Sequence, residues 1–315
     1  MRLSLNDAIQ NSRNVGNARR FPTKDDPRVC DGAVFSKLFP RFFLTKGSSI
    51  FTLGSCFSRS IEEQLEGFLL PTRNFAVPES ERLGRPNGIL NEYNPGTMCQ
   101  RVEYAAKMAS FGELCIAPEG SGYIDLLLAE YVTPATKERL LERRAEVEKV
   151  YTALFESEAV IVTLDLVEVW YDKTAGLYLN RIPPAPLLFA DRKRFEMHIL
   201  DAHETQLLLE RMVNALLAIG VRKILLMVSP VPLEVTYSGR DCTVANMYSK
   251  AVLVVSSNSV SRLYPEVDYF PGYEIVMSAG PELYYPNSIN ERGDIVQLVT
   301  SFLIDRYTRC PEQNV

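Results

Sequence analysis

The sequence predicts a three-layer α/β/α sandwich around a mainly parallel sheet of about five strands. The first observation is that apolar runs of strand length alternate with helix-like segments along the chain. The second is that the run 159–164 is continuous and apolar, as expected for a central parallel strand buried on both faces. The third is a short apolar run, 50–53, that meets Gly54 and then a helical segment, which forms a strand–turn–helix unit.

Along the chain, residues 1–30 are polar and mixed in charge, so we expect an arm laid on the surface. Residues 31–315 are expected to form one domain, because 315 residues with 46% apolar content can bury a large core. The aromatic-rich stretch 31–48 should cover one edge of the sheet. Residues 99–157 should be a mainly helical insert, able to cap the site. The expected strands are 50–53, 74–77, 159–164, 223–228 and 267–270.

Composition limits the classes of function. The net charge is −5, with 34 basic and 39 acidic residues, which disfavours a nucleic-acid partner. No run approaches the roughly 18 apolar residues of a membrane span, and the amino terminus lacks the apolar core of a signal peptide. We therefore expect a cytoplasmic protein. Its six cysteines are scattered and should be free thiols, and two histidines make a zinc site improbable, so we expect no metal and no cofactor.

The turn after the first strand carries the main candidate for chemistry. A strand that turns through Gly54 into a helix places Ser55 at the carboxyl edge of the sheet, where open α/β folds bind ligands. Ser55 is therefore a candidate nucleophile, and its own N–H a candidate oxyanion donor beside the free N–H groups of the helix start. The alternative is that Ser55 only caps the helix. Cys56 is a second candidate nucleophile, because a helix start lowers a thiol pKa, or else an apolar packing residue.

The residues of this turn resemble a family signature. Phe51-Thr-Leu-Gly-Ser-Cys-Phe-Ser-Arg-Ser-Ile-Glu62 is similar to the signature of the GSCFA family, related to the SGNH (GDSL-like) esterases and acyltransferases, with Ser58 where the signature has Ala. The resemblance runs from about residue 30 to 306 and implies an SGNH/flavodoxin-like fold with ester chemistry at Ser55. Other matching strings are Asn91-Glu-Tyr-Asn-Pro95, Ser229-Pro-Val-Pro-Leu233, Asn246-Met-Tyr-Ser-Lys250 and Tyr269-Phe-Pro-Gly-Tyr-Glu274.

The resemblance also implies where the rest of the site comes from. In an SGNH-like site a loop glycine supplies a second oxyanion N–H, and Gly88 and Gly96 both qualify by type. Asn91 and Asn94 are candidates for polar contacts with substrate. For all four residues the alternative is a plain role in a turn, since the segment 85–98 is dense in Asn, Gly and Pro.

Two later strings supply further candidates. Asp165-Leu-Val-Glu-Val-Trp170 resembles the family's Gly-Leu-x-Glu-x-Trp, with Asp165 in place of Gly. Glu168 is the second site residue: it would orient a partner, bind polar groups of the substrate or stay protonated, the alternative being a surface ion pair. Trp170 matches the pattern and would contact substrate. Asn246 or Lys250 would lie near bound substrate, unless Asn246 caps its helix.

This chain departs most from the family pattern at the general base. SGNH enzymes take it from an Asp-x-x-His before the last helix, and in that register this chain has Tyr285 and Ser288, neither an efficient base at neutral pH. The remaining candidates are His198, His203 and Glu168. For His203, in the first turn of a helix, an ordinary surface position is the alternative.

These features give two hypotheses from different classes. The first is a Ser55-dependent esterase or O-acyltransferase that acts on a hydroxylated small molecule or sugar, for example as one step of a biosynthetic pathway. Its partners would be an acyl ester substrate and, for transfer, an acyl donor. The second is a catalytically degenerate SGNH-like binding or accessory protein, which Tyr285 and Ser288 favour.

Overall fold

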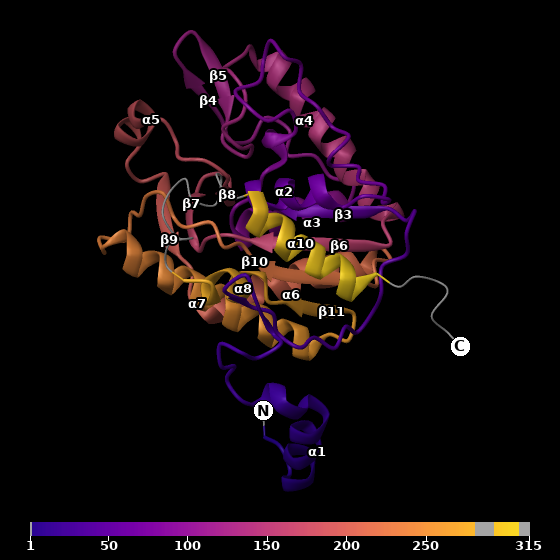
Figure 1. Cartoon of the computed structure of the whole chain (residues 1–315). Coiled ribbons are helices and arrows are strands. Elements are labelled where there is room, and N and C mark those ends of the chain that lie inside the picture. The colour runs from indigo at the N-terminus through magenta and orange to yellow at the C-terminus, as the bar shows by residue number, and fades with distance from the viewer. Residues whose placement is uncertain (1, 281–292, 309–315) are drawn as a thin grey trace.

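A sheet of four parallel strands forms the centre of the protein (Figure 1). The computed structural model describes residues 2–280 and 293–308. In the sheet the strands lie in the order β11-β10-β6-β3, and Gly54 lies opposite Thr163 while Val228 lies opposite Leu164. This register brings the carboxyl ends to one edge. The strands are β3 (Ile50–Gly54), β6 (Ala159–Leu164), β10 (Ile224–Val228) and β11 (Val267–Phe270).

Helices cover both faces of this sheet, which confirms the predicted mixed α/β fold with a parallel sheet. Strand side chains alternate between two cores: Phe51 and Val160 face one, whereas Ile50 and Ile161 face the other. The first core is completed by α3 (Pro95–Ala106), α6 (Ala202–Ala218) and α7 (Cys242–Leu263). The second is completed by α2 (Cys56–Gln64), α8 (Gly272–Ser278) and α10 (Gly293–Tyr307).

The predicted strand at 74–77 is wrong, so the central sheet of the described residues has four strands rather than five. Asn74 donates its N–H to Leu70 O in a turn, and Val77 donates to Pro86 O just before Pro78. Within the described part of the chain, the outer side of β3 pairs only through isolated bridges near its two ends, Ser49 with Leu69 and Gly54 with Asn91. The apolar residues at 75 and 77 reflect burial against the core, which a loop can also provide.

The insert is not as uniformly helical as expected. Leu140, Val147, Tyr151 and Leu154 are buried, as their spacing predicts. A β-hairpin, however, lies between the helices and was not predicted. A second small sheet, antiparallel with the order β8-β7-β9, follows β6. The elements of these regions are η2 (Gly88–Leu90), β4 (Ile116–Glu119), β5 (Gly122–Asp125), α4 (Lys137–Tyr151), η3 (Thr152–Glu156), β7 (Glu168–Asp172), β8 (Leu177–Leu179), α5 (Ala185–Ala190) and β9 (Phe195–Ile199).

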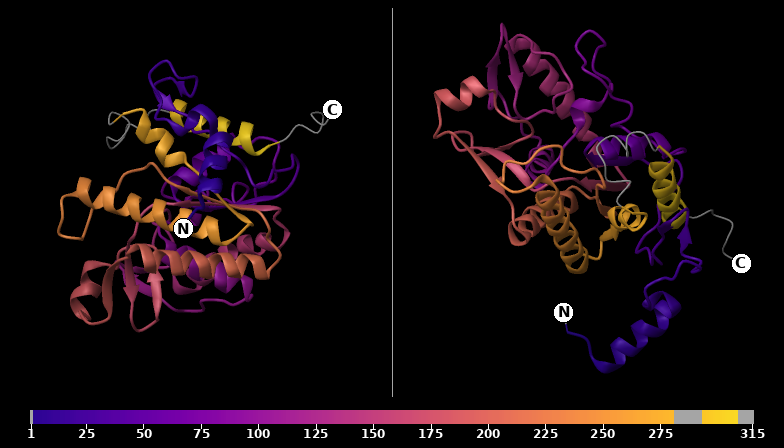
Figure 2. Two further views of the ribbon diagram at one scale, coloured as in Figure 1. Left: turned by 90° about the horizontal axis from the view of Figure 1, so that it is seen from below. Right: turned by 60° about the vertical axis from the view of Figure 1, so that its left-hand side comes forward.

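The amino-terminal arm contains an unpredicted helix that extends away from the rest of the chain (Figure 2). Residues 31–48 then cover the outer edge of β11, as expected: Arg41 N–H donates to the Asp268 side chain, and its guanidinium donates to Val267 O. None of the described helices is long and apolar enough to cross a membrane. The elements of this part are α1 (Leu5–Val15), η1 (Gly16–Arg19), β1 (Val29–Cys30) and β2 (Ala33–Val34).

Candidate functional site

The carboxyl edge of the central sheet gathers polar residues from three neighbouring strands. Ser55 follows β3, Asp165 follows β6 and Ser229 follows β10. Ser229 N–H donates to Leu164 O, which continues the ladder one residue beyond the strand. This edge is the position at which open α/β sheets bind ligands.

Ser55 begins α2 without using its side chain to cap the helix. Its backbone is extended (φ −75°, ψ −168°), and its carbonyl, not its hydroxyl, accepts the N–H of Ser58 at 2.9 Å. The residue is fully buried, and Oγ has no hydrogen-bond partner among the described residues. Because buried hydroxyls are almost always paired, an unpaired one at this edge calls for an explanation.

Gly54 lets the chain pass closely over the neighbouring strand. A Cβ at this position would lie 2.6 Å from Thr163 O and 2.8 Å from Thr163 Cβ. Any side chain would therefore push β3 away from β6 at the point where Ser55 is placed. The glycine of the turn is thus required by packing, whatever chemistry Ser55 performs.

Cys56 does not have the lowered thiol pKa that its place at a helix start predicted. Burial raises the pKa of the Cys56 thiol to about 11, and the nearby Asp165 carboxylate adds to this. Backbone N–H groups at the helix start favour the thiolate, but their effect is smaller than that of burial. The thiol therefore stays protonated at neutral pH, which favours the apolar packing role over that of an activated nucleophile.

The loop before α3 lies directly beside the Ser55 turn. Asn91 is buried and pairs with Gly54 in an isolated bridge, and the following Glu92 N–H donates to Gly54 O at 3.0 Å. Asn91 Nδ2 lies 3.5 Å from the Tyr93 hydroxyl, and Asn91 Oδ1 has no partner in the part of the chain that the structure describes. Burial raises the pKa of Tyr93 well above its usual value, so its phenol keeps its proton.

The two candidate glycines of this loop differ in what their N–H groups do. Gly88 N–H donates to Arg85 O at 3.0 Å, and a Cβ there would lie 2.3 Å from the Tyr131 ring. Gly96 is the second residue of α3, where a helix N–H has no intrahelical acceptor. Asn94 caps this helix by accepting Thr97 N–H at 2.9 Å, and it also lines a cavity described below.

Lys250 makes a buried ion pair at the end of β6. Its Nζ donates to Asp165 Oδ1 at 2.9 Å and to Asp165 O at 2.6 Å, and Lys250 is fully buried. Asp165 also donates its N–H to Tyr93 O. The aspartate that replaces the family's glycine is therefore held by a lysine from α7 and linked to the loop before α3.

Glu168 fixes the segment 229–241, which connects β10 to α7. Glu168 Oε1 accepts the Thr236 hydroxyl at 2.5 Å, and Oε2 accepts Tyr237 N–H at 2.8 Å. Asn246 supports the same segment by accepting Leu233 N–H at 3.1 Å. Asn246 does not cap its helix: α7 begins at Cys242, and Asp241 is the capping residue.

Next to Glu168 lies a cavity of about 290 Å³. Trp170 and Tyr237 form part of its wall, with their rings in an edge-to-face contact 5.6 Å apart. Asn180 is one of two buried amides of the wall, beside Asn94: its Nδ2 donates to Asn91 O at 2.6 Å, and its Oδ1 has no partner among the described residues. Apolar walls with a few polar groups are typical of small-molecule sites.

The two histidines lie on the small antiparallel sheet and at the start of α6. His198, on β9, stacks on Tyr171 and lies 3.3 Å from Glu196 Oε2. His203 is exposed in the first turn of α6. The predicted positions Tyr285 and Ser288 lie outside the described residues. Among the described residues no group of His, Cys, Asp or Glu could hold a metal ion.

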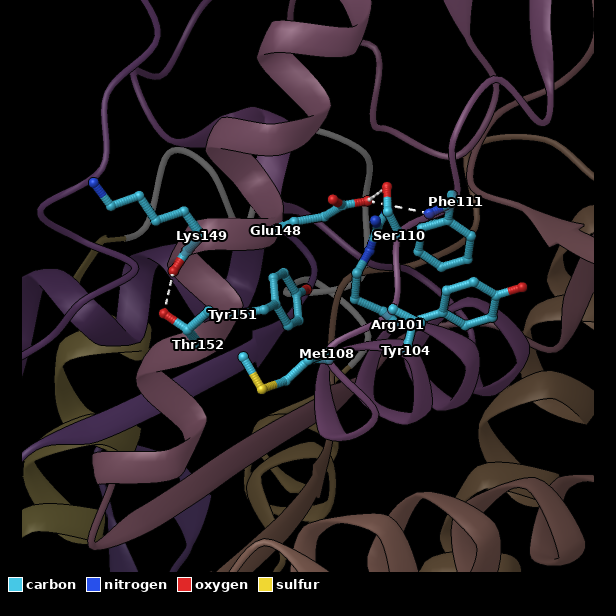
Figure 3. A pocket seen from close by; sticks show the side chains of 11 residues that line it. Arg101, Tyr104, Met108, Ser110, Phe111, Glu148, Lys149, Tyr151 and Thr152 are labelled. Atoms are coloured by element: carbon cyan, nitrogen blue, oxygen red, sulfur yellow. Dashed lines mark hydrogen bonds between the residues drawn. The ribbon is translucent and has the colours of Figure 1, made fainter.

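A second cavity, of about 200 Å³, lies between α3 and α4 (Figure 3). Tyr104 and Phe111 stack 3.9 Å apart in its wall, and Glu148 accepts Ser110 Oγ and Phe111 N–H. None of the predicted site residues that the structure describes lines it. Arg101 connects this wall to the turn that carries Ser55. Its Nε donates to the Glu92 side chain, and the Glu92 N–H donates to Gly54 O.

Sequence reasoning missed four residues near the site: Tyr93, Tyr131, Asn180 and Tyr237. Tyr93 belongs to a string that was singled out, so the string itself was the available signal. Tyr131 reaches the site from the insert, Asn180 from beyond β8 and Tyr237 from the segment before α7. No local sequence pattern marks these three residues.

The comparisons with known proteins agree with this arrangement at the level of the family. No protein of curated function and no solved structure matches this chain. The model of the GSCFA family matches residues 49–301, from just before β3 into α10, a span that includes every candidate residue described above. Because that match covers most of the sequence, the protein belongs to the GSCFA family.

Proposed function

We propose that this protein is a Ser55-dependent acyl ester enzyme of the SGNH type, an esterase or O-acyltransferase acting on a hydroxylated small molecule or sugar. The observation that carries the proposal is the Ser55 side chain. It lies at the carboxyl edge of a parallel sheet, begins a helix without capping it, and has no described partner. A base that takes the hydroxyl proton would make Oγ a nucleophile toward an acyl carbonyl.

In this proposal the oxyanion is held by N–H groups on two sides of Ser55. One is Ser55 N–H at the start of α2. The second is better supplied by Gly96 than by Gly88, since Gly88 N–H is already donated to Arg85 O. The Asn91 side chain, which lies beside Gly54 and has an unpaired oxygen among the described residues, would contact the substrate.

The cavity beside Glu168 would receive the substrate. Trp170 and Tyr237 offer ring faces on which an acyl group or a sugar ring can pack, and Asn180 and Asn94 offer polar contacts. Glu168 would act as a positioning residue, because both of its oxygens hold the segment that carries Tyr237. Lys250 and Asn246 would likewise act through the backbone they hold.

A second candidate function is a binding or accessory protein that uses the same cavity without catalysis. Two observations favour it. Neither imidazole contacts Ser55 among the described residues, and the Asp-x-x-His register holds Tyr285 and Ser288. Full burial of Ser55 also means that a substrate could reach Oγ only after a local opening.

The two functions are separated by labelling with a fluorophosphonate, which reacts only with an activated serine. We expect intact mass to show one adduct on the wild-type protein and none on Ser55→Ala. The matched control is Ser58→Ala, which removes another fully buried hydroxyl of the same helix that also lacks a described partner. Ser58→Ala and Cys56→Ala should label as the wild type does. An unlabelled wild-type protein would exclude an activated serine and leave the binding function.

A further inference from the structure

The outward face of α7 carries almost no charge. From Thr243 to Ser261 the only charged residue is Lys250, which is fully buried. The exposed positions of this stretch include Val244, Met247 and Val255, each about half exposed, at spacings that place them on one side of the helix. A helix of this length spans about 33 Å. Helices that face only water carry charged residues on their outer side, so this face indicates a protein contact.

The amino-terminal arm carries a matching apolar stripe that is also uncovered. Leu5 and Ile9 lie one turn apart on α1 and are 75% and 42% exposed, and α1 has no buried residue. The helix is formed in full, with a capping box between Ser4 and Asp7. Phe21, just after the arm's helical part, is 94% exposed. Exposed aromatic side chains of this kind dominate the energetics of interfaces.

Polar contacts fix the end of α1 and the turn after it to the segment that follows. Arg28 donates to Ala18 O and Arg20 O, and Lys37 donates to Asn14 O, where α1 ends. Figure 1 shows α1 on the side of the molecule where α7 and β11 lie, and the view from below in Figure 2 shows α7 across that side. The stripe therefore does not cover the chain's own α7, although both lie on the same side.

We propose that α1 of one copy docks on the α7 face of a second copy, and that the second copy's α1 docks in return. A two-fold axis makes the two contacts identical and closes the assembly as a dimer. Net charge favours this occupant through long-range attraction between arm and body, while the contact itself is apolar: residues 1–30 carry six basic and three acidic side chains, a net charge of +3, so residues 31–315 carry −8 of the total of −5. The polar side of α1 is mainly Asn and Gln rather than Lys and Arg, which fits a protein partner better than an anionic membrane.

The test measures molar mass by light scattering on the full chain over a dilution series. The wild-type protein should have twice the chain mass of 35.5 kDa and dissociate on dilution. Leu5→Gln/Ile9→Gln on the arm and Met247→Gln/Val255→Gln on α7 leave the charge unchanged. Each pair should raise the dimer dissociation constant at least ~30-fold, the size of one lost hot-spot residue.

Exposed apolar residues elsewhere provide the matched controls. Leu207→Gln on α6 and Phe189→Gln on α5 replace side chains that are 47% and 70% exposed, and they should leave the molar mass unchanged. Circular dichroism of each variant checks that the fold is kept. Equal loss of the dimer in a control variant would overturn the assignment of the surface.

Mixing the two double variants tests the reciprocal geometry. The α7 variant keeps an intact arm and the arm variant keeps an intact α7 face, so the mixture should recover a heterodimer held by one of the two contacts. A wild-type chain that is monomeric at all concentrations, including one that binds anionic vesicles instead, would contradict the proposal. So would a dimer that survives the arm variant, since it would indicate direct α7–α7 pairing.

Discussion

Two buried polar clusters in this chain differ in how completely their groups are paired. In the insert, Arg144 donates from all three guanidinium nitrogens, to Asp125, Gly112 O and Leu114 O, and Asp125 also accepts Leu127 N–H. At the sheet edge, Ser55 Oγ, Asn91 Oδ1 and Asn180 Oδ1 have no partner among the described residues. Each unpaired buried group costs stability, so the substrate proposed above would offset at the sheet edge a cost that the Arg144 cluster avoids by internal pairing.

The largest effect should come from opening the paired cluster. Arg144→Met leaves the buried Asp125 carboxylate without its cation, so the free energy of unfolding should fall by about 3–5 kcal/mol. Urea unfolding, monitored by circular dichroism, measures this change in the free energy of unfolding. The double variant Arg144→Met/Asp125→Leu removes both charges and should recover most of the loss. A loss below ~1 kcal/mol in the single variant would mean that the insert does not depend on this pair.

The Cys56 thiol tests whether the site edge is as dry as its burial indicates. A pKa of about 11 instead of 9.0 means that roughly one hundredth as much thiolate is present near neutral pH, so alkylation by iodoacetamide should be slower by about 100-fold than at an ordinary thiol. The rate should rise about tenfold per pH unit up to pH 11. Mass spectrometry of Cys56 and of an unstructured cysteine peptide in the same sample provides the comparison, because the neighbouring Asp31 carboxylate raises the pKa of the exposed Cys30 thiol. Equal rates at pH 7 would contradict the raised pKa.

The segment 229–241 should be sensitive to the loss of a single anchor. Asn246→Ala removes the acceptor of Leu233 N–H inside the protein, which should lower the free energy of unfolding by about 1–3 kcal/mol. Asn258→Ala on the same helix is the matched control, since Asn258 is only partly buried and bonds within α7. Limited proteolysis at 229–241 should accelerate in Asn246→Ala alone. Unchanged proteolysis would show that the segment is held by Glu168 without Asn246.

The smallest effect on stability should come from Ser55 itself. Because its hydroxyl has no described partner, Ser55→Ala should leave the free energy of unfolding within about 1 kcal/mol of the wild type, or raise it. The same variant should abolish labelling, so stability and reactivity would separate at this residue. Thermal and urea unfolding measure the stability, and intact-mass analysis measures the labelling. A loss above ~2 kcal/mol would indicate that Oγ is paired in solution.

Sequence patterns were enough to predict the alternation of strands and helices, all four strands of the parallel sheet with their bounds to within a residue, and the turn that places Ser55 at the sheet edge. These follow from local features: continuous apolar runs, a glycine at a strand end and the periodicity of Leu140, Val147 and Tyr151. The family strings added Glu168 and the loop before α3, because such strings join residues that share a site.

The remaining features depend on contacts between distant parts of the chain. Residues 75–77 are apolar, yet among the described residues they pair with no strand, and pairing is a non-local property. A helix start lowers a thiol pKa, yet burial beside Asp165 outweighs it at Cys56. Neighbours far along the chain decide whether Ser55 caps α2, which of Gly88 and Gly96 has a free N–H, and whether α7 faces water. Side-chain packing and desolvation act between such neighbours, and local sequence does not encode them.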